Sequence, residues 1–283
     1  MDTERLTWAI GEPVVRVTPF GGRGYTPARR MIVELADGTT VFAKQAVNEY
    51  TAGELRREHA NYLRLDPSFM PRLRGWDDDG SVEPILVLDD LSGAHWPPPW
   101  RLDQVRQVLD TITAIGRQPV PDGMPVLDES SINGGWQAVA EEPEPFLSLG
   151  LCTRAGLDWM LPTMLEASAA AKLSGDSVVH LDVRSDNLCF SGDRTVFVDW
   201  NHTCLANPEL DRAAFLPSMH AEGGPRPDDV ADIDVTMVAV IAGFFAARAG
   251  LPPVPDAPGV RPIQRKQLEV ALPWAIRALG LGS

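Results

Sequence analysis

Cysteine, long apolar runs and basic residues are all scarce in this 283-residue chain. The three cysteines, Cys152, Cys189 and Cys204, are widely spaced and form no CxxC pair, so the sequence favours small buried thiols over a disulfide framework. No apolar run reaches the length of a membrane span, and we therefore expect no membrane partner. The first ten residues contain no apolar core followed by a cleavage site, which predicts a cytoplasmic protein.

The shortage of basic residues is uneven along the chain. Residues 1–88 contain 11 Lys and Arg against 13 Asp and Glu, whereas residues 89–283 contain 14 against 26. Because a nucleic-acid-binding protein needs a basic stripe, this balance predicts no nucleic-acid partner. An acidic C-terminal two thirds attracts a cationic small molecule, although the same acidity also serves solubility alone.

The first ninety residues have the pattern of a small sheet with one helix. Residues 13–20, 29–38 and 39–46 are rich in β-branched and alternating residues, which predicts three consecutive antiparallel strands. Residues 48–65 have apolar side chains at helical spacing among charges, and residues 83–91 form an apolar run of strand length. The helix is therefore expected between the third and fourth strands.

Helical periodicity dominates the rest of the chain. We predict helices over four ranges, namely 101–117, 154–173, 228–250 and 263–279. Short strands are predicted over residues 177–181, 187–190 and 195–200. Residues 118–153 are rich in Pro, Gly and Ser and contain six acids without one Lys or Arg. This segment is predicted to be a loop-rich acidic insertion with at most short helices.

The stretch VVHLDVRSDNLCF, residues 178–190, places polar groups between two apolar runs. Asp182 and Asn187 follow one predicted strand, and Asp199 ends the later strand TVFVDW. A carboxylate can accept the proton of an attacking hydroxyl, and an asparagine oxygen with a second carboxylate suits Mg²⁺. Phosphoryl transfer requires mainly positioning and charge neutralisation, which such a set of residues supplies.

These residues carry a resemblance to a known family. HLDVRSDN resembles the catalytic loop HxDxxxxN of the protein-kinase-like fold, and VFVDW resembles its metal-binding strand end. The Asp-Trp form and the later NPELDRAAFLPSM resemble the aminoglycoside phosphotransferase family more than the protein kinases. The resemblance covers roughly residues 10–280 and implies an α+β, two-lobed protein-kinase-like fold. The implied parts are a small antiparallel-sheet lobe over 1–88, a hinge over 89–93 and a larger, mainly helical lobe over 94–283.

The resemblance also implies roles for individual residues. Asp182 is expected to be the catalytic base or the carboxylate that positions the hydroxyl, and Arg184 to steady the transferred phosphoryl group. Asn187 and Asp199 are expected to hold Mg²⁺. The remaining residues are expected to bind ATP or GTP: Lys44 at the phosphates, Glu58 orienting Lys44, and the hinge residues Leu88, Asp89, Asp90 and Leu91 at the base.

Some parts of the pattern depart from the kinases. Gly21, Gly22 and Gly24 do not complete the GxGxxG spacing of a phosphate-covering loop. Glu49 and Glu54 lie near Glu58 in sequence, and Glu58 is chosen for its REHANYL context. An Ala-Pro-Glu segment is absent after Asp199, which argues against protein substrates. His180 and Asp211 are expected to hold the catalytic loop by packing and hydrogen bonding.

The acidic C-terminal region predicts a small polar, cationic acceptor such as an aminoglycoside or another basic antibiotic. Because the implied fold needs no second subunit, we also expect a monomer. The candidate amine contacts are five acids: Glu141, Glu142, Glu144, Asp228 and Asp229. A sugar, an amino alcohol or a biosynthetic intermediate is the alternative acceptor. Two further alternatives are a hydrolase with a metal held by His180, Asp182, Asp199 and His202, and an inactive kinase-like fold that acts as a binding module.

Overall fold

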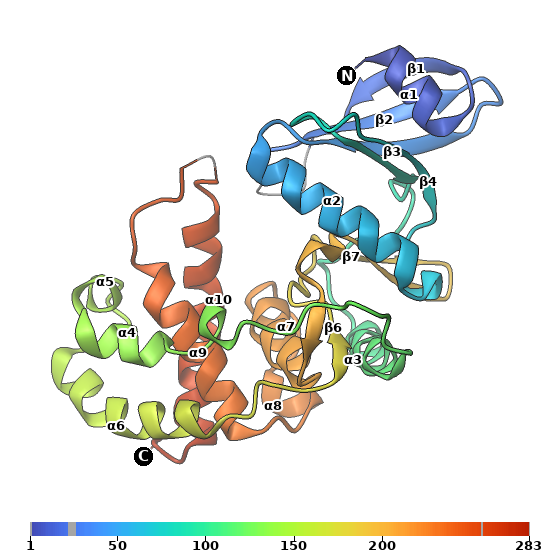
Figure 1. Ribbon diagram of the computed structural model, residues 1–283. Helices are drawn as coiled ribbons and strands as arrows, with labels where there is room; N and C mark the ends of the chain where they lie inside the picture. Colours follow the sequence, from blue (N-terminus) through green and yellow to red (C-terminus); the bar gives the residue numbers. More distant parts are fainter. Residues whose placement is uncertain (1, 22–26, 256, 283) are drawn as a thin grey trace. The chain divides into compact units, whose positions relative to one another are not determined.

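The structure is a computed structural model that describes residues 2–21, 27–255 and 257–282 (Figure 1). The chain divides into two compact units: unit 1 comprises Met1–Pro97 and Asp186–Thr203, and unit 2 comprises Pro98–Ser185 and Cys204–Ser283. The lobe boundaries expected near residues 88 and 94 stay a prediction. None of the helices in the described residues is long and apolar enough to cross a membrane.

Unit 1 is built on a five-stranded antiparallel sheet with the order β1-β2-β3-β5-β4. Its strands are β1 (Val14–Pro19), β2 (Arg29–Leu35), β3 (Thr40–Gln45), β4 (Leu73–Asp77) and β5 (Ile85–Asp89). Four of these strands coincide with the predicted ones. Sequence reasoning missed β4, because its sequence LRGWD lacks apolar alternation and contains Gly75.

The two faces of the sheet are separated by the period-two alternation of β3. Val41 and Ala43 are fully buried on one face, while Phe42 and Lys44 lie on the other. Phe42 pairs in register with Leu88 of β5, so these two side chains stand next to each other on the face that carries Lys44. The register therefore brings a lysine and a patch of apolar side chains to one surface.

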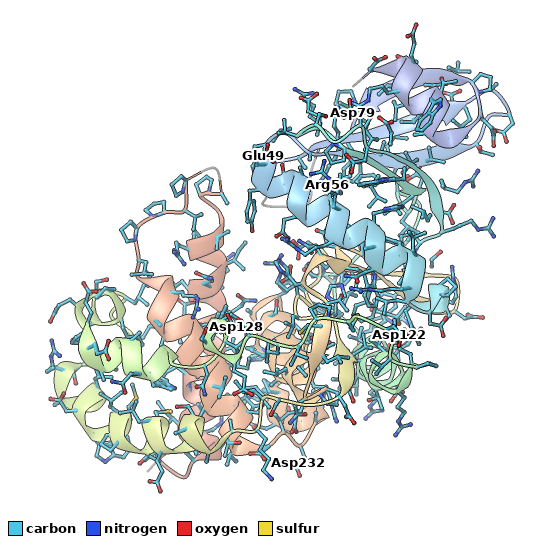
Figure 2. The ribbon with its side chains drawn as sticks, in the orientation of Figure 1. Glu49, Arg56, Asp79, Asp122, Asp128 and Asp232 are labelled. Atoms are coloured by element: carbon cyan, nitrogen blue, oxygen red, sulfur yellow. The ribbon has the colours of Figure 1, made fainter. Side chains whose placement is uncertain are left out.

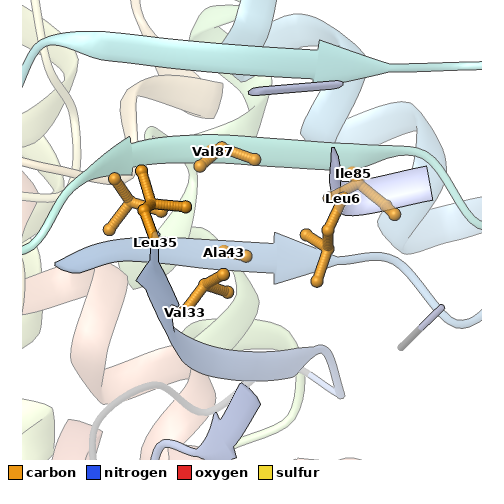
Figure 3. Packing of buried hydrophobic residues seen from close by; sticks show 7 residues of the cluster. Leu6, Val33, Leu35, Ala43, Ile85 and Val87 are labelled. Atoms are coloured by element: carbon orange, nitrogen blue, oxygen red, sulfur yellow. The ribbon is translucent and has the colours of Figure 1, made fainter. Parts of the chain in front are cut away.

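The opposite face of the sheet forms the core of unit 1 (Figure 3). Leu6 of α1 (Thr3–Ile10) packs there against Val33, Ala43, Ile85 and Val87, all of which are fully buried. Burial of each of the Leu, Val and Ile side chains contributes about 1.5–3 kcal/mol. Helix α1 was not predicted, and its single fully buried residue explains why its sequence shows little helical periodicity.

Helix α2 (Glu49–Arg64) lies on the Lys44 side of unit 1. Its buried face includes Leu55, Glu58 and Tyr62, which recur at the three- and four-residue spacing of one helix face. Asn61 Nδ2 donates a hydrogen bond of 2.5 Å to the carbonyl oxygen of Trp200 in the short helix η3 (Trp200–His202). This bond ties α2 to the segment that follows Asp199.

A bidentate ion pair fixes the outer side of α2. Arg56 Nε and Nη2 each donate to a carboxylate oxygen of Asp78 at 2.8 Å, in the connection between β4 and β5. Figure 2 shows Arg56 beside Asp79 of the same connection. Because bidentate pairs fix orientation as well as distance, this contact sets how α2 packs on the sheet.

Unit 2 is mainly helical. Its elements are α3 (Leu102–Arg117), α4 (Gly135–Glu141), α5 (Glu144–Leu147), α6 (Arg154–Ala170), β6 (Ser177–Val179), β9 (Cys204–Ala206), α7 (Glu209–Ala221), α8 (Pro227–Val230), α9 (Val235–Ala249) and α10 (Val260–Ala278). The nearly all-apolar α9 packs against α4, α6 and α10. The helix predicted from residue 228 begins instead at Val235, because the Asp234 side chain accepts a hydrogen bond from Thr236 N and caps α9 there.

Candidate active site

All eight residues predicted to bind nucleotide or metal line one cavity, which lies wholly within unit 1 and is called the unit 1 cavity below. These residues are Lys44, Glu58, Leu88, Asp89, Asp90, Leu91, Asn187 and Asp199. Phe20, Phe42 and Trp96 line the same cavity, so charged groups and aromatic surface meet in it. Such a combination suits a ligand with a planar apolar part and an anionic part.

Lys44 lies between two carboxylates in this cavity. Its Nζ donates to Glu58 Oε2 at 2.9 Å and to Asp199 Oδ1. Burial lowers the pKa of Lys44, but the charges of Asp199 and Glu58 outweigh it and hold the pKa above its usual range. Lys44 is therefore an ammonium group near neutral pH, placed to meet anionic oxygens.

Glu58 is the only one of the three candidate glutamates that pairs with Lys44 in the described part of the chain. Glu54 instead forms an ion pair with Arg57 on its own helix. Burial raises the pKa of Glu58, and the charge of Asp199 adds to the rise while Lys44 opposes it. The pair with Lys44 thus stabilises a carboxylate that is almost completely buried.

Asn187 and Asp199 stand at the same end of a two-stranded ribbon formed by β7 (Leu188–Ser191) and β8 (Arg194–Phe197). The backbone N–H of Val198 donates to the carbonyl oxygen of Asn187 at 2.9 Å and closes that end. Asp199 has a left-handed backbone with φ of 61°. Carboxylate and amide oxygens at one cavity wall are the donors that Mg²⁺ takes from proteins, so these two residues fit that ion.

The side chains of the hinge are occupied by structural contacts. Asp90 accepts hydrogen bonds of 2.8 Å from Thr40 Oγ1 and from Ser92 N, and Asp89 pairs with Arg74. The predicted contact of the hinge with a nucleotide base is therefore left to its backbone groups. Sequence reasoning did not single out Trp96 for this site, although its Nε1 donates to the carbonyl oxygen of Leu91 at 2.9 Å. Gly21 is described, whereas Gly22 and Gly24 of the glycine-rich stretch lie outside the described residues.

Asp182 and Arg184 belong to unit 2 and lie next to each other after β6. Arg184 Nε is 3.1 Å from Asp182 Oδ1, and both side chains are partly exposed. The backbone N–H of Asp182 donates to His180 Nδ1 at 3.3 Å, and His180 is completely buried. A carboxylate with a neighbouring guanidinium is suited to orient a hydroxyl and to meet a phosphoryl oxygen.

The buried Asp211 holds the backbone before Asp182. Its carboxylate accepts hydrogen bonds from His180 N at 2.6 Å and from Leu181 N at 2.7 Å. Leu181 has φ of 64°, which costs a branched residue about 1–3 kcal/mol. The two bonds offset that strain, so Asp211 braces the start of this loop, as predicted, and His180 is buried there.

We expect Asp211 to make the stability of the protein depend on pH. Burial raises the pKa of Asp211 to about 6 from 3.8, the two N–H donors oppose the rise, and the charge of Asp182 adds to it. Between these two pKa values the folded state binds more protons than the unfolded state. The stability that Asp211 contributes to the fold is therefore lost as pH rises through that window. The free energy of unfolding of Asp211→Asn relative to wild type should therefore rise by about 2–3 kcal/mol from about pH 4 to about pH 7. Urea unfolding across this range measures the difference, and a difference independent of pH would contradict it.

A second brace of the catalytic loop was missed in the sequence. Ser185 Oγ donates to Glu222 Oε1 at 2.6 Å, and Trp100 Nε1 donates to Glu222 Oε2 at 3.0 Å. Glu222 follows α7 and has no motif around it, so no local signal marked it. Glu222 and Asp211 together hold the loop at both ends.

The five acids predicted to contact amines do not line the cavity that contains Asp182. Glu144 pairs with Arg154, and Asp228 pairs with Arg277 at 2.8 Å. In the 118–153 segment, Asp122 and Asp128 lie well apart from each other (Figure 2). The role of Glu141, Glu142, Glu144, Asp228 and Asp229 as amine contacts stays a prediction.

A hydrolytic metal site formed by His180, Asp182, Asp199 and His202 is one of the alternatives that the sequence leaves open. Over residues 2–21, 27–255 and 257–282, no group of three or more His, Cys, Asp or Glu is arranged to hold a metal ion. His202 lies instead beside Glu54, with its Nε2 3.8 Å from Glu54 Oε2.

Several solved structures are similar to this chain. A spectinomycin phosphotransferase in complex with ADP and spectinomycin has a TM-score of 0.64 at 12% identity, over 98% of this chain and 97% of its own. A thermostable mutant of an aminoglycoside phosphotransferase, in a ternary complex with ADP and hygromycin B, has a TM-score of 0.58 at 11% identity, over 99% of each chain. A choline kinase from Streptococcus pneumoniae has a TM-score of 0.56 at 12% identity, over 95% of this chain and 94% of its own. At these identities the likeness shows the fold, which confirms the expected protein-kinase-like α+β fold.

No curated protein sequence matches the chain. The model of one family, described as the phosphotransferase enzyme family, matches residues 18–237. This range contains every predicted site residue from Lys44 to Asp229, and it confirms the expected enzyme class, a small-molecule phosphotransferase. The chain belongs to the phosphotransferase enzyme family.

Proposed function

We propose that the protein transfers the γ-phosphoryl group of ATP or GTP to a hydroxyl group of a small molecule. The observation that carries the proposal is the unit 1 cavity. Its walls include the hinge together with four polar residues, Lys44, Glu58, Asn187 and Asp199. An ammonium paired with a buried glutamate, next to two hard oxygen donors, is the arrangement that phosphoryl transfer requires of the donor site.

The base of the nucleotide is proposed to lie against the hinge backbone of residues 88–91. Phe42 and Leu88 stand opposite each other in register, and the Trp96 indole is fixed by its bond to Leu91. These apolar side chains match the faces of a planar base, while the hinge amides match its edges. Binding of adenine nucleotides by the similar phosphotransferases supports this assignment.

The phosphates are proposed to lie toward Lys44, Asn187 and Asp199. Lys44 binds the phosphate oxygens as a permanent cation, and Glu58 keeps its ammonium oriented. Asn187 and Asp199 would hold Mg²⁺, which neutralises developing charge on the phosphate oxygens when it is bound.

Asp182 is proposed to accept the proton of the acceptor hydroxyl or to hold that hydroxyl in line with the phosphorus. Arg184 is proposed to stabilise the charge of the transferred group, since its guanidinium lies beside the Asp182 carboxylate. These residues would serve a cationic acceptor such as an aminoglycoside or another basic antibiotic. They would equally serve the alternatives, a sugar, an amino alcohol or a biosynthetic intermediate. A cytoplasmic location and a monomeric state stay predictions.

Replacement of Lys44 by methionine should weaken ATP binding by about 10- to 100-fold, because charge-assisted bonds to phosphate contribute about 1.5–3 kcal/mol. Isothermal titration in the presence of Mg²⁺ measures the dissociation constants of ATP and GTP, and their ratio shows whether adenine or guanine is preferred. Lys266→Met is the matched control, since Lys266 is exposed on α10 and lies outside the unit 1 cavity. Equal affinities for wild type and Lys44→Met would remove Lys44 from the nucleotide site.

A further inference from the structure

A second cavity lies wholly within unit 2 and contains Asp182 and Arg184. We call it the acceptor cavity; it is lined by the catalytic loop together with residues of α7, α9 and α10. Its volume is about 170 Å³, roughly ten times what a single water requires. The cavity is therefore large enough to receive part of an organic molecule next to the catalytic carboxylate.

The walls of the acceptor cavity are apolar. Leu210, Ile241, Phe244, Phe245 and Ile263 contribute aliphatic and aromatic surface. Among the described lining residues, the charged ones are Asp182 and Arg184, which pair with each other. An amino group inside this cavity would lose its hydration. The carboxylate that lines the cavity, that of Asp182, already pairs with the Arg184 guanidinium.

One lining residue offers an unused hydrogen-bonding group. Gln267 of α10 is 5% exposed, and in the described part of the chain its side chain makes no hydrogen bond. Its neighbour Gln264, in contrast, accepts from Arg261 Nη1 at 2.8 Å. Because Gln267 lines the cavity and its amide is not among the buried side-chain groups left without a partner, the amide is accessible from the cavity and can hydrogen-bond to a ligand there.

A cation already covers one face of Phe244, an aromatic residue of the cavity wall. The guanidinium carbon of Arg248 lies 3.9 Å from the centroid of the Phe244 ring, in the position that a cationic ligand would take on that ring face. Burial is the larger cause that lowers the pKa of Arg248, and the charge of the nearby Arg261 lowers it further. A polycation would therefore meet like charges at this side of the cavity.

We propose that the acceptor is an uncharged alcohol with an apolar body, whose reacting hydroxyl lies at Asp182 and whose second polar group hydrogen-bonds to Gln267. This inference rests on the proposed phosphotransferase function. In the transfer step the hydroxyl oxygen forms a bond to the γ-phosphorus, and the bond from that phosphorus to the β–γ bridging oxygen breaks. The leaving electron pair stays on the nucleoside diphosphate, and the hydroxyl proton passes to the Asp182 carboxylate.

The test compares two sets of acceptors with the full-length enzyme, Mg²⁺ and ATP. One set contains neutral monoterpene and aryl-alkyl alcohols, and the other contains amino sugars and aminocyclitols. Mass spectrometry measures phosphorylated product, and titration with ATP is measured in parallel. We expect kcat/KM to be at least about 10-fold higher for the neutral set, and Ile263→Glu, which adds a carboxylate to the wall, to shift the preference toward the cations.

Gln267→Leu provides a second variant that preserves side-chain volume. It should raise KM for neutral acceptors that carry a second polar group by about 10-fold, leave KM for those without one unchanged, and leave the melting temperature unchanged or higher. Gln137→Leu, at an exposed position of α4 outside the cavity, is the matched control.

Three outcomes would overturn the inference. The first is a wild-type preference for the polycations, and the second is a Gln267→Leu enzyme with unchanged KM for every acceptor. The third is ATP binding without product from either set, which rejects the acceptor class while the nucleotide site stands. If the wild type bound neither ATP nor GTP, the proposed function would be rejected instead, and the inference with it.

Discussion

Asp182→Asn should lower the rate of phosphoryl transfer by about 10²- to 10⁴-fold, the range that a positioned general base contributes. The affinity for ATP should not change, because the residues that line the unit 1 cavity all belong to unit 1 and Asp182 belongs to unit 2. Measurement of kcat/KM for the acceptor together with the dissociation constant of ATP separates the two effects.

The same variant should keep its stability. The charge of Asp182 raises the pKa of the buried Asp211, so its removal relieves a repulsion within the braced loop. We therefore expect a melting temperature equal to or above that of wild type, which would distinguish a catalytic role from a structural one. Asp176→Asn, at an exposed position before β6, is the control and should retain full activity. Retention of activity by Asp182→Asn would exclude it as the base.

Asp199→Asn should lower transfer by about 100- to 1,000-fold, since several kcal/mol of charge stabilisation are lost with a metal ligand. Asparagine is the suitable replacement because Asp199 has a left-handed backbone, which asparagine adopts more readily than other residues. The variant should also lose most of the dependence of ATP affinity on Mg²⁺. Titrations with and without Mg²⁺ test this expectation.

Asp193→Asn is the matched control for this second prediction. Asp193 is exposed at the turn between β7 and β8, six residues before Asp199, and its replacement leaves both the unit 1 cavity and Lys44 untouched. It should bind ATP and transfer phosphate as the wild type does. An Asp199→Asn enzyme with an unchanged response to Mg²⁺ would exclude Asp199 as a metal ligand.

The resemblance to the kinase-like fold placed Lys44, Glu58 and Asp199 in one site, and each of them also stands at a position that a local pattern marks. Lys44 follows an alternating strand, Glu58 lies on the buried face of a periodic helix, and Asp199 ends an apolar run. The order of these elements along the chain then assigns the residues to a single site. The structure brings Lys44, Glu58 and Asp199 into direct contact.

The parts that sequence reasoning missed depend on contacts that leave no local signal. Strand β4 includes Gly75, where an added Cβ would lie 2.4 Å from the carbonyl oxygen of Ala9, so a close approach of α1 decides its residue type. Asp228 has its partner Arg277 forty-nine positions away. The walls of the acceptor cavity likewise come from helices that are distant in sequence, and charge counts along the chain could not show that those walls are apolar.

The fate of the γ-phosphate tests the central claim most directly. The wild-type enzyme and Asp182→Asn would be incubated with ATP labelled in its γ-phosphate, Mg²⁺ and the two acceptor sets, and the label would be followed into organic product, inorganic phosphate and protein. The account predicts that the wild type places the label on the hydroxyl of a small molecule and that Asp182→Asn does not. Label that appears only as inorganic phosphate, at a rate independent of acceptor and equal in both enzymes, would contradict it.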